Sequence, residues 1–246
     1  MWTVKRAGGA RVKRAGKRKF ESCQFSTVVT TAYTMDELAG EIRLCGACPL
    51  SKKRKNAVPG EGRLRSGIVF VGEAPGAKED AQGRPFIGSA GKLLSGLLKI
   101  NGILREEVFI TNTVKCRPPG NRPPKPAEMN ACRPYLERQL HILKPRLVCT
   151  LGNSPLHALV GAGLNISEVH GKITEVGGIR FLPLYHPAAI LYRRRLMVEM
   201  EKDFKVIGRI AREAPAAPEP PSGERPLPNE VPPLVGHIEE WADRGR

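Results

Sequence analysis

Four side chains of different chemistry follow short apolar runs in the sequence, and together they could bind and cleave a nucleoside. Glu73 comes directly after one run, Asn112 ends the next, and His186 comes two residues after a later one. An amide can make two hydrogen bonds to a base edge, and a carboxylate and an imidazole can assist cleavage of a glycosidic bond. Phe86, in the loop after the first run, offers a ring on which an unstacked base could lie.

Each of these residues also has a purely structural interpretation. Glu73 could be a solvated residue of a chain reversal, Asn112 could cap a turn, and His186 could be held in an extended or turn geometry by the proline that follows it. The chemical interpretation is favoured because all of them lie at strand ends. Ligands of parallel sheets bind outside the carboxyl ends of the strands, and this is the edge where a flipped base would be recognised.

Four cysteines predict a metal centre. Cys45 and Cys48 form a C-x₂-C pair, and fifteen residues separate Cys116 from Cys132. One turn can supply two thiolates to a metal, and two more complete a tetrahedral or a cubane set, so the spacing allows zinc or an iron–sulfur cluster. Cys149 lies inside an apolar run and is expected in the core.

Strand and helix patterns alternate along the chain. Short continuous apolar runs predict buried strands, and leucines at helical spacing predict helices between them. The expected helices cover residues 34–44, 90–100, 126–143 and 154–160, and the expected strands cover 67–72, 108–111, 147–151 and 179–184. This order predicts an α/β fold in three layers, α/β/α, with a central, mostly parallel four-stranded sheet.

Two dissimilar tails flank the expected domain, which covers residues 32–213. Residues 1–31 carry a net charge of +7 and no apolar periodicity, while residues 214–246 are rich in proline and carry −3. Both tails are expected to be disordered. Since the whole chain carries +16, the domain itself carries +12, which favours a polyanionic partner such as nucleic acid.

The sequence also argues against membrane and secreted classes of protein. No run approaches the roughly 18 apolar residues that a spanning helix needs, and the basic N-terminus lacks the apolar segment of a secretory signal. We therefore expect a soluble cytoplasmic protein, associated with the nucleoid and without a membrane partner.

Seven motifs, in order, resemble those of the family 4 uracil-DNA glycosylases, the thermostable iron–sulfur class of archaea and bacteria. They are Cys45–Cys48, Val58–Gly62, Gly72–Gly76, Gly83–Gly88, Thr111–Arg122, Cys132–Leu136 and His186–Ala189. The resemblance implies base excision repair: hydrolysis of the N-glycosidic bond of flipped-out deoxyuridine in double- or single-stranded DNA, which leaves an abasic site. It implies no lysine nucleophile, and therefore no strand cleavage.

The resemblance also assigns roles to residues. It implies a [4Fe–4S] cluster on Cys45, Cys48, Cys116 and Cys132, and a uracil site bordered by Glu73, Ala74, Pro75, Phe86, Asn112 and His186. In that site Phe86 stacks on the base, Asn112 reads its edge and rejects cytosine, and His186 donates to O2 and stabilises the departing anion. Glu73 positions or activates water, or stabilises the oxocarbenium-like sugar.

The segment after His186 is expected to contact DNA. Ile190 and Leu191 could form a wedge that enters the base stack, and Arg193 could hold a phosphate. The alternative is a charged entry to the final helix. The resemblance further implies a monomer, and the proline-rich tail is expected to dock a repair or replication partner.

Two positions differ from the better-known family 1 glycosylases. Ala74 stands where that family has a water-activating aspartate, and Gly76 stands where it has a tyrosine that blocks the methyl group of thymine. Water activation is therefore expected from Glu73 or another group. Exclusion of thymine is expected from Glu79, Asp80 or the shape around Phe86.

Three other classes share part of the pattern. Family X glycosylases bind uracil-DNA covalently through a histidine after the second strand, but residues 113–131 contain none. A non-catalytic nucleic-acid-binding protein would have the same charge pattern. A zinc-stabilised regulatory domain would have the same cysteines.

Overall fold

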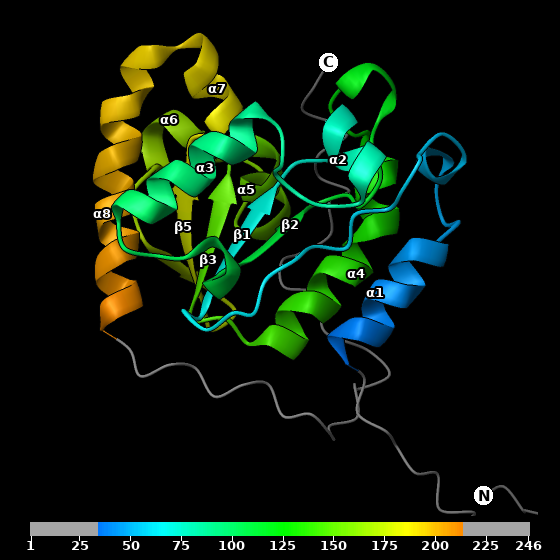
Figure 1. Ribbon diagram of the computed structural model, residues 1–246, viewed down its shortest axis with the longest axis horizontal. Coiled ribbons are helices and arrows are strands. Elements are labelled where there is room, and N and C mark those ends of the chain that lie inside the picture. Colours follow the sequence, from blue (N-terminus) through cyan, green and yellow to red (C-terminus); the bar gives the residue numbers. More distant parts are fainter. Residues whose placement is uncertain (1–33, 214–246) are drawn as a thin grey trace, which may run out of the picture.

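A five-stranded sheet forms the middle layer of the computed structural model, which describes residues 34–213 (Figure 1). The strand order is β2-β1-β3-β5-β4. The parallel strands are β1 (Ile68–Gly72), β2 (Phe109–Asn112), β3 (Leu147–Leu151) and β5 (Ile179–Leu184), and the antiparallel edge strand is β4 (Thr174–Val176). The expected α/β fold and mostly parallel sheet are confirmed, whereas the expectation of four strands was wrong. The fifth strand has three residues and is largely exposed, so it leaves no apolar run.

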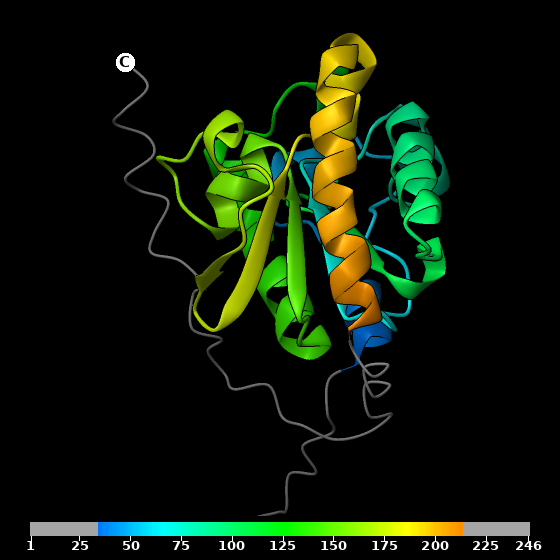
Figure 2. The same cartoon turned by 90° about the vertical axis from the view of Figure 1, so that its left-hand side faces the viewer.

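Helices cover both faces of the sheet, as Figure 2 shows with α3 and α8 on one side and α4 and α5 on the other. The helices are α1 (Met35–Leu44), α2 (Ala77–Gln82), α3 (Ser89–Ile100), α4 (Pro126–Leu143), α5 (Asn153–Leu159), α6 (Ile166–Val169), α7 (Pro187–Tyr192) and α8 (Met197–Arg212). Short 3₁₀ turns lie at Pro49–Lys52, Arg105–Glu107, Pro119–Asn121 and Arg194–Leu196. None of the helices in residues 34–213 combines the length and apolar character needed to cross a membrane.

The side chains of β1 alternate between two hydrophobic cores because strand residues point to opposite faces in turn. Ile68 and Phe70 pack with α3 and α8, while Val69 and Val71 pack with α1 and α4. Cys149 of β3 is fully buried in the first core, as its apolar run predicted. The sheet is therefore buried on both faces, and it can present polar side chains only at its edges and strand ends.

The first helix begins as its sequence predicts. The Thr34 hydroxyl accepts the Glu37 N–H at 3.2 Å, and the Glu37 carboxylate accepts the Thr34 N–H at 2.7 Å, which makes a capping box. The bounds of α3, α4 and α5 also agree with prediction to within a residue. The two expected tails, residues 1–31 and 214–246, lie outside the described residues.

The register of the parallel strands aligns their carboxyl ends. Gly72 of β1 pairs with Asn112 of β2, and Leu151 of β3 pairs with Leu184 of β5. The loops that follow these four strands therefore meet at one edge of the sheet, where α2 and α7 lie in Figure 1.

Candidate active site

Asn112 and Phe86 converge over Gly72, where β1 and β2 end side by side. A Cβ atom on Gly72 would lie 2.5 Å from both Asn112 Oδ1 and Phe86 Cζ, so only glycine leaves room for the two side chains. Asn112 is 1% exposed, and its Oδ1 has no hydrogen-bond partner among the described residues. Leaving a buried acceptor unpaired costs about 1–3 kcal/mol, which a ligand that donates a hydrogen bond would recover.

Phe86 has a left-handed backbone, with φ of 50°, which is unusual for an aromatic residue. Glu79 of α2 supports this conformation, because its Oε1 accepts the N–H groups of Ile87 at 3.0 Å and Gly88 at 2.8 Å. The ring is nevertheless buried, with 7% exposure. The loop is therefore held with its aromatic side chain turned toward the strand ends.

Ion pairs hold the same loop from its other side. Glu61 binds Arg84 at 2.8 Å and Arg105 at 3.0 Å, and Arg105 also donates to the Pro85 carbonyl at 2.7 Å. Burial alone would raise the pKa of the Glu61 carboxyl, but hydrogen bonds from the two arginines outweigh it and lower the pKa. Sequence reasoning missed Glu61 and Arg105 as supports, although the Val58–Gly62 motif contains the first of them.

His186 is held as a neutral imidazole with a donor available. Its Nδ1 accepts the Ala188 N–H at 3.1 Å, so the ring proton of the neutral form is on Nε2. Burial lowers the pKa of His186 to about 4, which keeps the ring uncharged at neutral pH. The ring centroid lies 5.8 Å from that of Phe86. The imidazole and the aromatic ring therefore border the same space.

Glu73 follows β1 as a half-buried carboxylate. Burial raises the pKa of Glu73, and the nearby Ser154 hydroxyl opposes the rise without forming a hydrogen bond of good geometry. The Glu73 carbonyl accepts the Val114 N–H at 3.1 Å, which ties this loop to the one after β2. Pro75 is buried, and Ala74 packs in part against the second core. Ser154 had no signal in the sequence that distinguished it.

Glu79 and Asp80, two candidates for excluding thymine, both have structural partners. Asp80 is 3% exposed and accepts the N–H groups of Lys55 at 2.8 Å and Asn56 at 3.3 Å. A Cβ atom at Gly76 would lie 2.7 Å from Glu79 Oε2, so a larger side chain would displace the carboxylate that supports the Phe86 loop. Both carboxylates therefore support the local structure, and exclusion of thymine by the shape around Phe86 stays a prediction.

The expectation that Ile190 contacts DNA was wrong. Ile190 is 2% exposed and packs in the core with α3 and α8, because α7 turns this residue inward. Leu191 is 46% exposed, Tyr192 is 89% exposed and Arg193 is exposed. These three neighbours, including a tyrosine that sequence reasoning did not single out, form the accessible part of the segment.

The four cysteines line one cavity between α1 and α4. Cys45 ends α1, Cys48 precedes the first 3₁₀ turn, Cys116 follows β2, and Cys132 lies on α4. All of them are free of disulfide bonds. Within residues 34–213, no three His, Cys, Asp or Glu side chains are arranged to hold a single metal ion.

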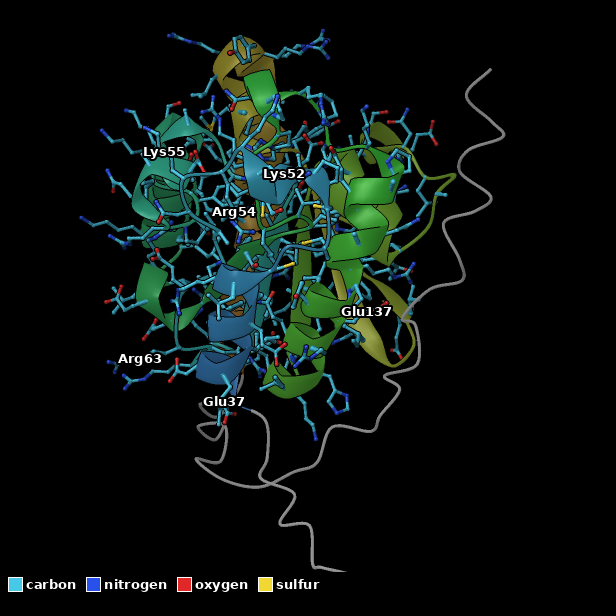
Figure 3. All side chains as sticks on the ribbon, turned by 90° about the vertical axis from the view of Figure 1, so that its right-hand side faces the viewer. Glu37, Lys52, Arg54, Lys55, Arg63 and Glu137 are labelled. Atoms are coloured by element: carbon cyan, nitrogen blue, oxygen red, sulfur yellow. The ribbon has the colours of Figure 1, made fainter. Side chains whose placement is uncertain are left out.

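Two of these sulfurs accept hydrogen bonds from nitrogen. Arg54 Nη1 donates to Cys116 Sγ at 3.0 Å, and the Lys115 backbone N–H donates to Cys132 Sγ at 3.3 Å. Figure 3 shows Arg54 beside the sulfur atoms, on the loop that also carries Lys52 and Lys55. Burial raises the pKa of Cys116, and raises that of Cys132 to about 11. Metal binding would therefore have to displace protons from both thiols.

Comparisons with known proteins show the family to which the chain belongs. The model of the uracil DNA glycosylase superfamily matches residues 59–207. The chain is 44% identical to the type-4 uracil-DNA glycosylase of Archaeoglobus fulgidus over 185 residues, which cover 72% of this chain and 93% of that protein. It is 47% identical to the type-4 enzyme of Saccharolobus solfataricus over 182 residues, or 70% and 84% of the two chains. The type-4 enzyme of Pyrobaculum aerophilum is 48% identical over 171 residues, or 66% and 87%.

Proposed function

Since the chain belongs to the type-4 uracil-DNA glycosylases of the uracil DNA glycosylase superfamily, we propose that it hydrolyses the N-glycosidic bond of deoxyuridine flipped out of DNA. The products are free uracil and an abasic site, the first step of base excision repair. The observation that carries the proposal is the convergence of Asn112, Phe86 and His186 at the strand end that Glu73 follows.

Asn112 distinguishes uracil from cytosine by its amide. Uracil presents an N3–H donor and an O4 acceptor, which match the amide oxygen and the NH₂ group of Asn112. The buried Oδ1 without a partner supports this role, because it is the atom that would accept N3–H. Cytosine presents an acceptor and a donor at these positions, so its binding would leave both groups unpaired. Phe86 stacks on the base, and the shape of its loop is the part of the site proposed to exclude the C5 methyl group of thymine.

His186 stabilises the leaving group. As the bond between C1′ and N1 breaks, the electron pair moves into the uracil ring and negative charge develops at O2. The Nε2–H of neutral His186 donates to this oxygen, and the Ala188 N–H fixes the donating tautomer. Removing one such donor typically lowers kcat by about 10²–10³-fold.

Glu73 acts on the sugar side of the bond. Its carboxylate stabilises the positive charge that develops at the sugar, and it accepts a proton from the water that adds to C1′. A pKa raised by burial makes the carboxylate a better base than a solvated one. The unpaired Ser154 hydroxyl nearby is the group available to orient that water.

The DNA strand passes over the exposed residues beside the site. Leu191 and Tyr192 supply the apolar surface that fills the space left by the flipped nucleotide, and Arg193 binds a phosphate. Exposed Lys52 and Lys55 extend the positive surface along the segment that follows Cys48 (Figure 3). Asp80 of α2 accepts the Lys55 N–H and so ties this segment to the helix beside the site.

The four cysteines, Cys45, Cys48, Cys116 and Cys132, form the cysteine centre, which holds a [4Fe–4S] cluster in this proposal. Four sulfurs without disulfide bonds border one cavity, and N–H donors point at two of them, which is the donor set that such a cluster uses. When bound, the cluster supplies iron–thiolate bonds that tie α1 and the loop after β2 to α4. No step of the hydrolysis passes through it.

Release of uracil from a single-uracil oligonucleotide tests the activity. Protein with its full iron content is expected to release free uracil and leave sites that break only on treatment with alkali. Duplexes with U:G and U:A pairs and single strands are compared with cytosine and thymine controls. A protein that binds these DNAs and releases no uracil would be a non-catalytic binding protein. An iron-to-sulfide ratio near one supports the cluster, and stoichiometric zinc would refute it.

A further inference from the structure

Lys115 is a fully buried lysine whose ammonium group reaches the strand end of the active site. Its side chain is 1% exposed. Lys115 Nζ donates to Thr111 Oγ1 at 2.8 Å, to the Asn112 carbonyl at 2.7 Å and to Gln139 Oε1 at 2.7 Å. All three ammonium protons therefore have acceptors, and one acceptor is the backbone of the residue that reads the base.

The main chain of Lys115 belongs to the cysteine centre. Its N–H donates to Cys132 Sγ at 3.3 Å, and the next residue is Cys116. Its carbonyl accepts the Val58 N–H at 2.7 Å. One residue thus contacts a sulfur through its backbone and the Asn112 strand end through its side chain.

The buried charge has no carboxylate partner. None of the ion pairs in residues 34–213 includes Lys115, and its three acceptors are neutral. An ammonium group out of water without a counter-charge is strongly destabilising. The three hydrogen bonds from Nζ are therefore what stabilises the ammonium group in this place.

We propose that Lys115 is a positioning residue that couples the filled cysteine centre to the placement of Asn112. The backbone N–H of Lys115 binds Cys132 Sγ, and its ammonium group fixes the Asn112 carbonyl and hence the direction of its amide. The role of Asn112 in base reading rests on the proposed function. The coupling rests on a filled cysteine centre, which is also part of that proposal, but not on the excision of uracil.

Gln139 and Thr111 complete the arrangement. Gln139 Nε2 and Thr111 Oγ1 both donate to the Pro59 carbonyl, at 2.7 and 2.8 Å. Gln139 Oε1 is thereby turned toward the ammonium group. Without the ammonium, the three acceptors around Lys115 lose a shared donor, and the end of β2 is free to shift.

Lys115→Met tests the positioning, since methionine keeps most of the side-chain volume and removes the charge. The holoprotein is expected to keep its visible absorption and its circular dichroism, to lose kcat by roughly tenfold or more, and to change KM by less than about threefold. Selectivity is measured as the affinity ratio for duplexes with 2′-fluoro-deoxyuridine and 2′-fluoro-deoxycytidine, and it is expected to fall. Lys99→Met removes an exposed ammonium from α3 and should change none of these values. Wild-type kcat and selectivity in Lys115→Met would overturn the proposal.

Melting temperatures test the coupling to the centre without a measurement of activity. Lys115 links the centre to the end of β2 through its backbone and its ammonium group, so iron removal should lower the melting temperature of the wild-type protein more than that of Lys115→Met. Gln139→Met removes one acceptor of the ammonium group and should also reduce the fall, whereas Gln139→Glu keeps an acceptor there and should not. Equal falls in all four proteins would refute the coupling. If wild-type protein releases no uracil, the proposed function fails and this measurement still decides the coupling.

Discussion

The cysteine centre and the strand-end site lie on either side of one segment, residues 112–116, yet they are built in different ways. The centre uses four identical sulfurs that come from a helix end, two loops and a second helix. The site uses four different side chains, of which His186 is held by the Ala188 N–H and Phe86 by a loop that Glu79 supports. With the proposed cluster, the first arrangement depends on a shared bound group, whereas the second depends on the register of the sheet.

This difference predicts which substitutions should lower stability and which should lower catalysis. Loss of one sulfur weakens the attachment of every element that the centre joins, so its main effect is on stability. Loss of one side chain at the strand ends leaves a buried sheet that is stabilised by its own cores, so its main effect is on catalysis. Five substitutions or conditions can sharpen this contrast or break it.

The largest effect on catalysis is expected for His186→Ala. Loss of the Nε2–H donor should lower the single-turnover rate of uracil release by about 10²–10³-fold. The melting temperature should change little, because the ring is held by one hydrogen bond to the Ala188 backbone. A rate within about threefold of wild type would show that another group stabilises the leaving uracil.

Gly72→Ala should damage the site almost as much without touching a reacting group. The new Cβ would lie 2.5 Å from both Asn112 Oδ1 and Phe86 Cζ, so the two side chains would have to separate. We expect uracil release to fall by about 10²-fold, since misplacing a positioning group by 1 Å can have that effect. The control is Gly96→Ala on α3, whose Cβ would meet nothing within 4 Å. It should raise stability slightly, and equal activity in the two variants would refute the geometry.

Cys132→Ser should act on stability before catalysis. The variant is expected to lose visible absorption and to melt at least ten degrees lower, because a buried ligand of the centre is missing. Cys149→Ser is the matched control, since Cys149 is buried in the other core and away from the cavity. It should keep its colour. A stable, coloured Cys132→Ser protein would show that Cys132 binds no metal.

Much of this contrast could be predicted from the sequence. The apolar run at Leu147–Leu151 and the leucine spacing of Pro126–Leu143 each gave an element with those bounds. Both succeed because burial on two faces and amphipathic spacing leave strong patterns. The exposed β4 left no such pattern, and the inward turn of Ile190 depends on where α7 begins.

The supports of the site were harder to predict than its reactive groups. Glu79 acts by accepting two backbone N–H groups, and Glu61 acts by holding two arginines distant in sequence. A contact to a backbone N–H has no partner side chain that could be recognised in the sequence. The residues of a long-range ion pair have no fixed spacing along the chain. The sequence predicts Gly72 as the end of a strand. The structure shows why a glycine is needed there, because Asn112 and Phe86 approach it closely.

The pH profile should separate Glu73 from His186. Burial raises the pKa of Glu73 above 4.5 and lowers that of His186 to about 4. As the pH falls, Glu73 therefore takes up a proton first, and kcat/KM should decline through its pKa while His186 is still neutral. Glu73→Gln should be slower and nearly flat from pH 7 down to about 4.5. An acidic decline that persists in Glu73→Gln would assign it to another group, and circular dichroism at each pH controls for unfolding.

The smallest effect is expected for Arg84→Ala. Arg84 is largely exposed in its ion pair with Glu61, and exposed pairs contribute about 0–1 kcal/mol. Arg105 still binds Glu61 and the Pro85 carbonyl, so the Phe86 loop should remain in place. We expect less than a threefold change in uracil release at moderate salt. Arg105→Ala should be clearly more damaging, and the reverse order would contradict the support assigned to Arg105.

The strand order has a consequence for the order in which the protein acquires its abilities during synthesis. The base-reading residues follow β1 and β2, which are neighbours in both the chain and the sheet, while His186 follows β5, which can join only after β3. His186 is 74 positions beyond Asn112 in the sequence. At roughly 5–20 residues per second, the ribosome delivers it about 4–15 s later. Under the proposed roles, a nascent chain therefore holds the residues that recognise uracil before it holds the residue that releases it.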